Sequence, residues 1–71
     1  MSDFKSRLIE EKAQLDERLE KLQAFQKSDG FQSIAAVQQT LLNVQANAMA
    51  TYSQIVLERI AWLEHVGASQ A

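Results

Sequence analysis

The tripeptide Ser28-Asp29-Gly30 divides the chain into two stretches, and each has the composition of a single helix. Residues 4–27 are rich in Leu, Glu, Lys, Gln and Ala, which have high helix propensity. Residues 31–66 contain neither Gly nor Pro. Gly30 suits the left-handed conformation that commonly ends a helix. We therefore predict an all-α fold, an antiparallel hairpin of helices over about 4–27 and 31–66, because neither stretch alternates with the period of a strand.

Length and composition restrict the class of protein. A chain of 71 residues is short enough to predict one helical-hairpin domain over 1–71, with a frayed tail at 68–71. It has no cysteine and one histidine, so we predict no disulfide, no metal and no cofactor. A net charge of −2 argues against coating DNA. No apolar run is long enough to span a membrane, and we expect a cytoplasmic protein.

Sequence motifs of enzymes are missing. The two glycines lie too far apart for a phosphate-binding loop, and the single histidine, His65, falls in the last turn of the second predicted helix. Carboxylates such as Glu10, Asp16 and Glu20 alternate with Lys and Arg, which is typical of a solvated helix face. We predict that the protein is not an enzyme and has no catalytic residues.

The first predicted helix carries one leucine every seven residues, and further apolar side chains widen this seam: Leu8, Leu15 and Leu22, with Phe4, Leu19 and Phe25. The row that holds Phe4 and Phe25 also holds two charged residues, Glu11 and Arg18. Charges beside a seam are typical of a partly solvated face. A polar pocket that requires them is the alternative.

The second predicted helix has no charged residue from Gly30 through Leu57. It has two apolar stripes at a spacing of seven: Ile34, Leu41, Ala48, Ile55 and Trp62, and Ala35, Leu42, Met49, Val56 and Leu63. Between them runs a polar row: Gln38, Gln45, Tyr52 and Arg59. The apolar arc is wider than one partner helix needs. The polar row is either a hydrogen-bond ladder that fixes register between subunits, or a surface that faces a ligand.

Helix length predicts self-association. At 1.5 Å per residue the two helices are about 36 Å and about 54 Å long, which places residue 4 near residue 54. The last turns of the second helix, with Ile60, Trp62, Leu63 and Val66, would then overhang without an intramolecular partner. A two-helix hairpin also has little core for a stable monomer. We predict a homo-oligomer with an interface or core formed by Leu41, Gln45, Met49, Tyr52, Ile55, Trp62 and Leu63.

Basic residues are concentrated on the first predicted helix, which carries six of the seven: Lys5, Arg7, Lys12, Arg18, Lys21 and Lys27. An aromatic residue, Phe4, stands at the start of that helix. An aromatic ring stacks on a nucleobase, and guanidinium or ammonium groups neutralise phosphates. Arg59 is a further cation that could face an anionic ligand.

The chain resembles a known family of short proteins, most of them encoded by bacteriophages. The resemblance covers about residues 4–63 and rests on the pattern Leu22-x-x-Phe25, Ser28-x-x-Phe31 and Leu41-Leu42-x-x-Gln45-x-x-Ala48-Met49-x-x-Tyr52-x-x-Ile55-Val56-x-x-Arg59-Ile60. This is the helical-hairpin family that includes the phage anti-CBASS and anti-Thoeris sponges. The chain departs from those sponges in two features: they carry Tyr at the aromatic position, and their N-terminal segment is longer.

The resemblance implies an anti-defence function. Such hairpins assemble into a trimer-based hexamer or a similar oligomer, and bind cyclic dinucleotides, cyclic trinucleotides or cyclic ADP-ribose isomers between subunits without cleaving them. The family's stacking aromatic corresponds to Phe4, and its phosphate-binding residue to Arg18 or Lys21. With Arg7 and Arg59 added from the residue pattern, the predicted ligand-binding set is Phe4, Arg7, Arg18, Lys21 and Arg59.

Two other functions fit the same residues. One is an adaptor, or a direct inhibitor of a host protein, which binds a partner helix through the wide apolar arc. The other is a structural oligomer without a ligand. Saturable nucleotide binding that depends on Phe4 is expected of the sponge and of neither of these two alternatives.

Overall fold

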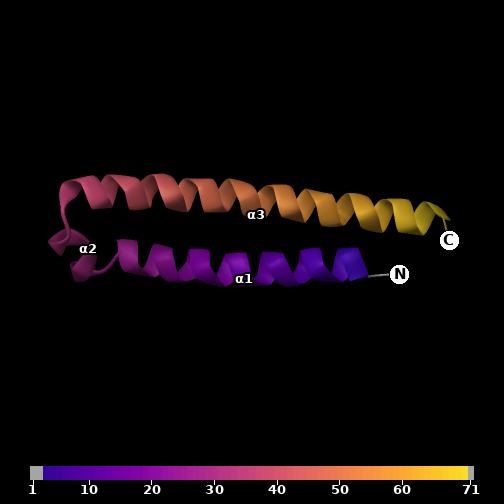
Figure 1. Ribbon diagram of the computed structural model, residues 1–71, viewed down its shortest axis with the longest axis horizontal. Helices are drawn as coiled ribbons and strands as arrows, with labels where there is room; N and C mark the ends of the chain where they lie inside the picture. Colours follow the sequence, from indigo (N-terminus) through magenta and orange to yellow (C-terminus); the bar gives the residue numbers. More distant parts are fainter. Residues whose placement is uncertain (1–2, 71) are drawn as a thin grey trace.

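The computed structural model describes the backbone of residues 3–70 and the side chains of residues 4–66. It consists of α1 (Asp3–Gln26), α2 (Asp29–Ser33) and α3 (Ala36–Gln70). The two long helices, α1 and α3, lie antiparallel, and the short α2 stands at the end where they connect (Figure 1). The molecule is a rod with extents of 54 × 15 × 14 Å. The predicted all-α hairpin is confirmed.

The connection between the long helices differs from the prediction. The second helix is not continuous from residue 31, because α2 ends at Ser33 and Ile34 is extended. Gly30 lies inside α2 and has no positive φ, so its predicted left-handed conformation is wrong. A β-carbon at Gly30 would lie 3.2 Å from Cε1 of Phe25. A larger residue at this position would therefore require the ring of Phe25 to shift by a few tenths of an ångström.

Phe31 anchors the connection. Its side chain is buried, and its ring meets that of Phe25 edge-on, with centroids 5.9 Å apart and an interplanar angle of 83°. Phe31 therefore folds back onto the end of α1. The Gln39 amide donates to the backbone carbonyls of Phe31 at 2.8 Å and Ile34 at 3.3 Å. These bonds satisfy carbonyls near the helix break, where helical partners are missing.

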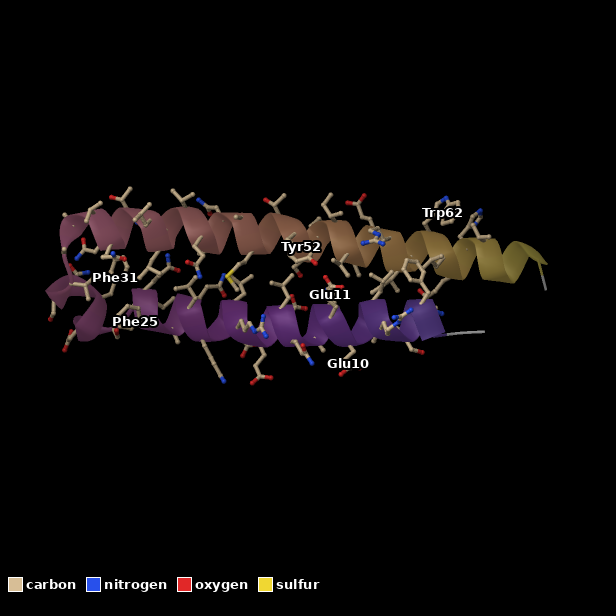
Figure 2. All side chains as sticks on the ribbon, in the orientation of Figure 1. Glu10, Glu11, Phe25, Phe31, Tyr52 and Trp62 are labelled. Atoms are coloured by element: carbon tan, nitrogen blue, oxygen red, sulfur yellow. The ribbon has the colours of Figure 1, made fainter. Side chains whose placement is uncertain are left out.

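The register of α1 against α3 corrects the predicted overhang. Lys5 Nζ lies 3.2 Å from a carboxylate oxygen of Glu64, so residue 4 does not lie near residue 54. The reason is that the connection extends to residue 35, and α3 begins five residues later than predicted, at Ala36 rather than residue 31. Ile60 is buried and Leu63 packs on the same cluster, so neither overhangs. Trp62 is exposed because it faces away from α1, as Figure 2 shows.

The core is a single seam between α1 and α3. Its central cluster is formed by Leu8, Val56 and Ile60, and Leu63 packs against it. Leu15 and Ala46 are also buried. On α3, Val56, Ile60 and Leu63 follow one another at spacings of four and three, and on α1 Leu8 and Leu15 are seven residues apart. This is the pattern of side chains that interdigitate between long antiparallel helices.

One polar contact crosses this seam. The buried Ser53 hydroxyl donates to Oδ1 of Asp16 at 2.5 Å, and Lys12 Nζ donates to Oδ2 of the same carboxylate at 2.6 Å. The hydrogen bonds from Lys12 and Ser53 hold the pKa of Asp16 below its usual range. A carboxylate bonded from both helices disfavours a slip of one helix along the other.

The far end of α3 also differs from the prediction. The helix continues through Gly67 to Gln70, so the predicted end near residue 66 is wrong. Ala71, the last residue of the predicted tail, lies outside the described residues. Over the described part of the chain, no helix is both long and apolar enough to cross a membrane.

Candidate functional site

The seam between α1 and α3 has two flanks that differ in chemistry. One flank is bridged near both ends, by the ion pair between Lys5 and Glu64 and by a 2.8 Å hydrogen bond from the Gln26 amide to Asn43. The other flank, which we call the polar flank, carries the two rows at a spacing of seven: Phe4, Glu11, Arg18 and Phe25 on α1, and Gln38, Gln45, Tyr52 and Arg59 on α3.

Two observations show that the rows of the polar flank face each other. The guanidinium carbon of Arg59 lies 5.8 Å from the centroid of the Phe4 ring. Two turns along, Glu11 on α1 and Tyr52 on α3 point toward one another (Figure 2). Because both rows repeat every seven residues and the helices are antiparallel, the register brings Arg18 to the level of Gln45.

The polar flank contains an open cavity of about 250 Å³, lined by Phe4, Arg7, Leu8 and Glu11. These positions follow one another on one face of α1 at helical spacing. The buried Leu8 gives the cavity an apolar contribution from the core, and the half-exposed ring of Phe4 is available to stack. An aromatic ring, a guanidinium group and a carboxylate therefore line one small hollow.

The charges at the cavity are not used in ion pairs within the described chain. Those pairs join Lys5 to Glu64, Lys12 to Asp16 and Lys21 to Glu17. Glu17 and Lys21 pair at 3.2 Å, whereas Arg7 and Glu11, at the same spacing of four on α1, form no ion pair in the described chain. Arg59 instead lies against the face of Phe4, a cation–π arrangement. The cationic groups of Arg7 and Arg59 remain available to an anion.

The predicted ligand-binding set is only partly brought together within one chain. Phe4, Arg7 and Arg59 gather at the end of the hairpin where α1 begins. Arg18 lies about 21 Å and Lys21 about 26 Å from Phe4 along the helix, at 1.5 Å per residue. Glu11, which the sequence left between a solvated face and a polar pocket, lines the cavity.

The predicted interface residues divide between two faces of α3. Leu63 packs on the core of its own hairpin, and Met49 is half-buried. Exposed on α3 are Leu41, Gln45, Tyr52, Ile55 and Trp62. A series of apolar side chains, 50% to 62% exposed, forms what we call the outer apolar face: Val37, Leu41, Val44, Ile55 and Trp62.

Comparison with known proteins identifies a family. The model of a protein family described as Sequestin matches residues 2–62, which is most of the chain. No curated protein and no solved structure matches. Among the described residues there is no group of three His, Cys, Asp or Glu side chains placed to hold a metal ion.

Proposed function

We propose a function from one premise: the chain belongs to the Sequestin family, whose members are phage sponge proteins that sequester and do not catalyse. The finer proposal is that this chain sequesters a cyclic nucleotide immune signal in the host cytoplasm. The ligand is a cyclic dinucleotide, a cyclic trinucleotide or a cyclic ADP-ribose isomer, as the family resemblance implies. The observation that carries the proposal is the cavity lined by the exposed ring of Phe4 and the guanidinium group of Arg7, with the guanidinium carbon of Arg59 5.8 Å from the centroid of that ring.

Each residue at the cavity has a definite task in this proposal. The ring of Phe4 stacks on a nucleobase, and the buried side chain of Leu8 excludes water beneath it. Arg7 and Arg59 bind phosphate, because a planar guanidinium group donates two parallel hydrogen bonds to phosphate oxygens. Arg59 moves along or off the Phe4 ring as the base arrives, since both use the face of the same ring.

The size of the cavity supports a binding site that is shared between two subunits. Its volume of about 250 Å³ lies below the range of roughly 300–1,000 Å³ that is typical of small-molecule sites. One chain therefore holds a base, and the rest of a cyclic nucleotide extends beyond it. We propose that a second subunit covers this part of the ligand, with its Arg18 or Lys21 as the phosphate contact.

The outer apolar face supplies the surface for that assembly. Val37, Leu41 and Val44 follow each other at spacings of four and three, and Ile55 and Trp62 lie two and three repeats of seven beyond Leu41. This spacing is typical of a helix that packs along a second helix. An apolar row of this length is rarely left in water. We propose that it packs against other copies of the chain, in a trimer-based hexamer or a similar homo-oligomer.

The experiment is a titration of the purified protein with the three ligand classes by calorimetry, using wild type, Phe4→Ala and Arg7→Ala. Ile9→Ala is the matched control, because Ile9 is a 48% exposed apolar residue of α1 that does not line the cavity. We expect saturable binding that both cavity variants weaken and the control retains. Binding that survives Phe4→Ala and Arg7→Ala would refute the site, and no binding by wild type would refute the proposed function.

A further inference from the structure

Adjacent glutamates on α1 have opposite surroundings. Glu11 lines the cavity with Phe4 and points toward Tyr52 on α3 (Figure 2). Glu10 points away from α3, on the outside of α1 (Figure 2), and accepts a 3.4 Å hydrogen bond from Gln14. The same side chain therefore occurs once inside the proposed site and once outside it.

The fold does not use the carboxylate of Glu11. Within the described residues, Glu11 takes part in none of the side-chain hydrogen bonds, and the ion pairs involve other carboxylates. Its side chain is exposed at the mouth of the cavity. Both oxygens are therefore free to accept hydrogen bonds, and replacing the carboxylate leaves the seam between the helices intact.

The position of Glu11 suits the edge of a base that stacks on Phe4. The two residues are two helical turns apart on one face, and helical side chains lean toward the N-terminus, so Glu11 leans toward the ring of Phe4. A flat base on that ring presents its edge along the helix. The carboxylate then meets the groups on this edge.

An ionised carboxylate accepts hydrogen bonds and donates none. Guanine offers two neighbouring donors, N1–H and the N2 amino group, and adenine offers the N6 amino group. Uracil offers a single N3–H between two carbonyl oxygens, which a carboxylate repels. A site built to hydrogen-bond a donor discriminates strongly against an analogue that lacks it.

From this arrangement, and resting on the proposed function, we infer that Glu11 is a specificity-determining residue. It selects a purine base that carries an amino group, and it excludes uracil. Phe4 contributes stacking, which every base supplies, and Arg7 and Arg59 contribute phosphate contacts, which every nucleotide supplies. Glu11 is the group at the cavity that distinguishes one base from another.

The test uses cyclic di-AMP, cyclic di-GMP and cyclic di-UMP, which differ in their bases, and measures Kd by calorimetry. A cyclic ADP-ribose isomer and its deamino analogue, in which a hydrogen atom replaces the amino group of the adenine, form a second pair. For wild type we expect an amino-bearing ligand to bind about tenfold or more tightly than its counterpart, the discrimination typical of one good base contact. Glu11→Gln should remove this preference, and Glu10→Gln should keep it.

The outcomes separate the inference from the function on which it rests. If Phe4→Ala abolishes binding but Glu11→Gln changes the Kd of all ligands equally or of none, base selection by Glu11 is refuted and sequestration stands. If wild type prefers the uracil ligand or the deamino analogue, the inference is also refuted. If wild type binds no ligand of either set, the proposed function fails, and the inference with it. Far-ultraviolet circular dichroism of each variant confirms that the helices are retained.

Discussion

Two valines on α3 allow the packing of the hairpin to be measured with one kind of substitution. Val56 is fully buried between Leu8 and Ile60, and Val44 is 60% exposed on the outer apolar face. Val56→Ala removes the equivalent of two buried methylene groups, at about 0.8 kcal/mol each. The cavity left behind raises the expected loss in the free energy of unfolding to about 2–3 kcal/mol. Chemical denaturation followed by circular dichroism measures it.

Val44→Ala is the matched control for this loss. In the hairpin alone its cost is within about 0.5 kcal/mol, the range for exposed positions. In the proposed oligomer it weakens association, so its effect grows as protein concentration is lowered toward the dissociation constant. Equal losses for both variants at a concentration where the chain is monomeric would refute the register of α1 against α3.

Three further outcomes follow from individual contacts. Asp16→Asn should lower the free energy of unfolding at neutral pH, because the depressed pKa of Asp16 means that its ionised form stabilises the fold. This contribution is present above pH 3.8, and it is lost as the pH falls through the lower pKa of the native state. Denaturation measured from pH 7 to pH 2 should therefore show that the difference in free energy of unfolding between wild type and Asp16→Asn becomes smaller in acid. A difference that stays constant with pH would contradict the contact. Trp62→Asp should dissociate the proposed homo-oligomer, because a charge cannot be covered by the outer apolar face of another copy. Light scattering would measure this as a fall in mass relative to wild type, and an unchanged oligomeric mass would place the interface elsewhere. Tyr52→Phe should change the free energy of unfolding of the hairpin by less than about 0.5 kcal/mol, because Tyr52 is 46% exposed. A loss above about 1 kcal/mol would show that its hydroxyl has a buried hydrogen-bond partner.

The helices and the faces they pack were predictable from the sequence. Leu8 and Leu15 stand on a seam at a spacing of seven, and both are buried. Val56 and Leu63 belong to the stripe of α3 that packs on α1. Periodicity reports which face of a helix is apolar, and this information is local to each helix.

The register was not predictable from the same pattern. When one helix slides along the other by seven residues, the same types of side chain meet again. The seven-residue repeat therefore determines which faces of the helices pack together, but it does not determine their relative position along the axis. The offset depends on the length of the connection, which the short α2 and the extended Ile34 lengthen to residue 35. The polar contact of Ser53 with Asp16 selects this offset, and only the assembled hairpin shows that they meet.

The candidate site was predictable in part. Phe4 and Arg7 are neighbours on one face of α1, so their proximity follows from helical spacing. Arg59 reaches Phe4 because of the register. The surroundings of Glu11 depend on the angle at which α3 packs against α1. For this reason the sequence alone was consistent with a solvent-facing position for Glu11.

Sequestration is tested most directly by following the ligand through one cycle of binding and release. The wild-type protein is titrated with cyclic dinucleotides, cyclic trinucleotides and cyclic ADP-ribose isomers by calorimetry, then denatured by heat, and the released ligand is identified by mass spectrometry. We predict saturable binding of one class and recovery of the ligand with unchanged mass. A converted product would contradict a sequestering function, and the absence of binding would contradict the proposed ligand.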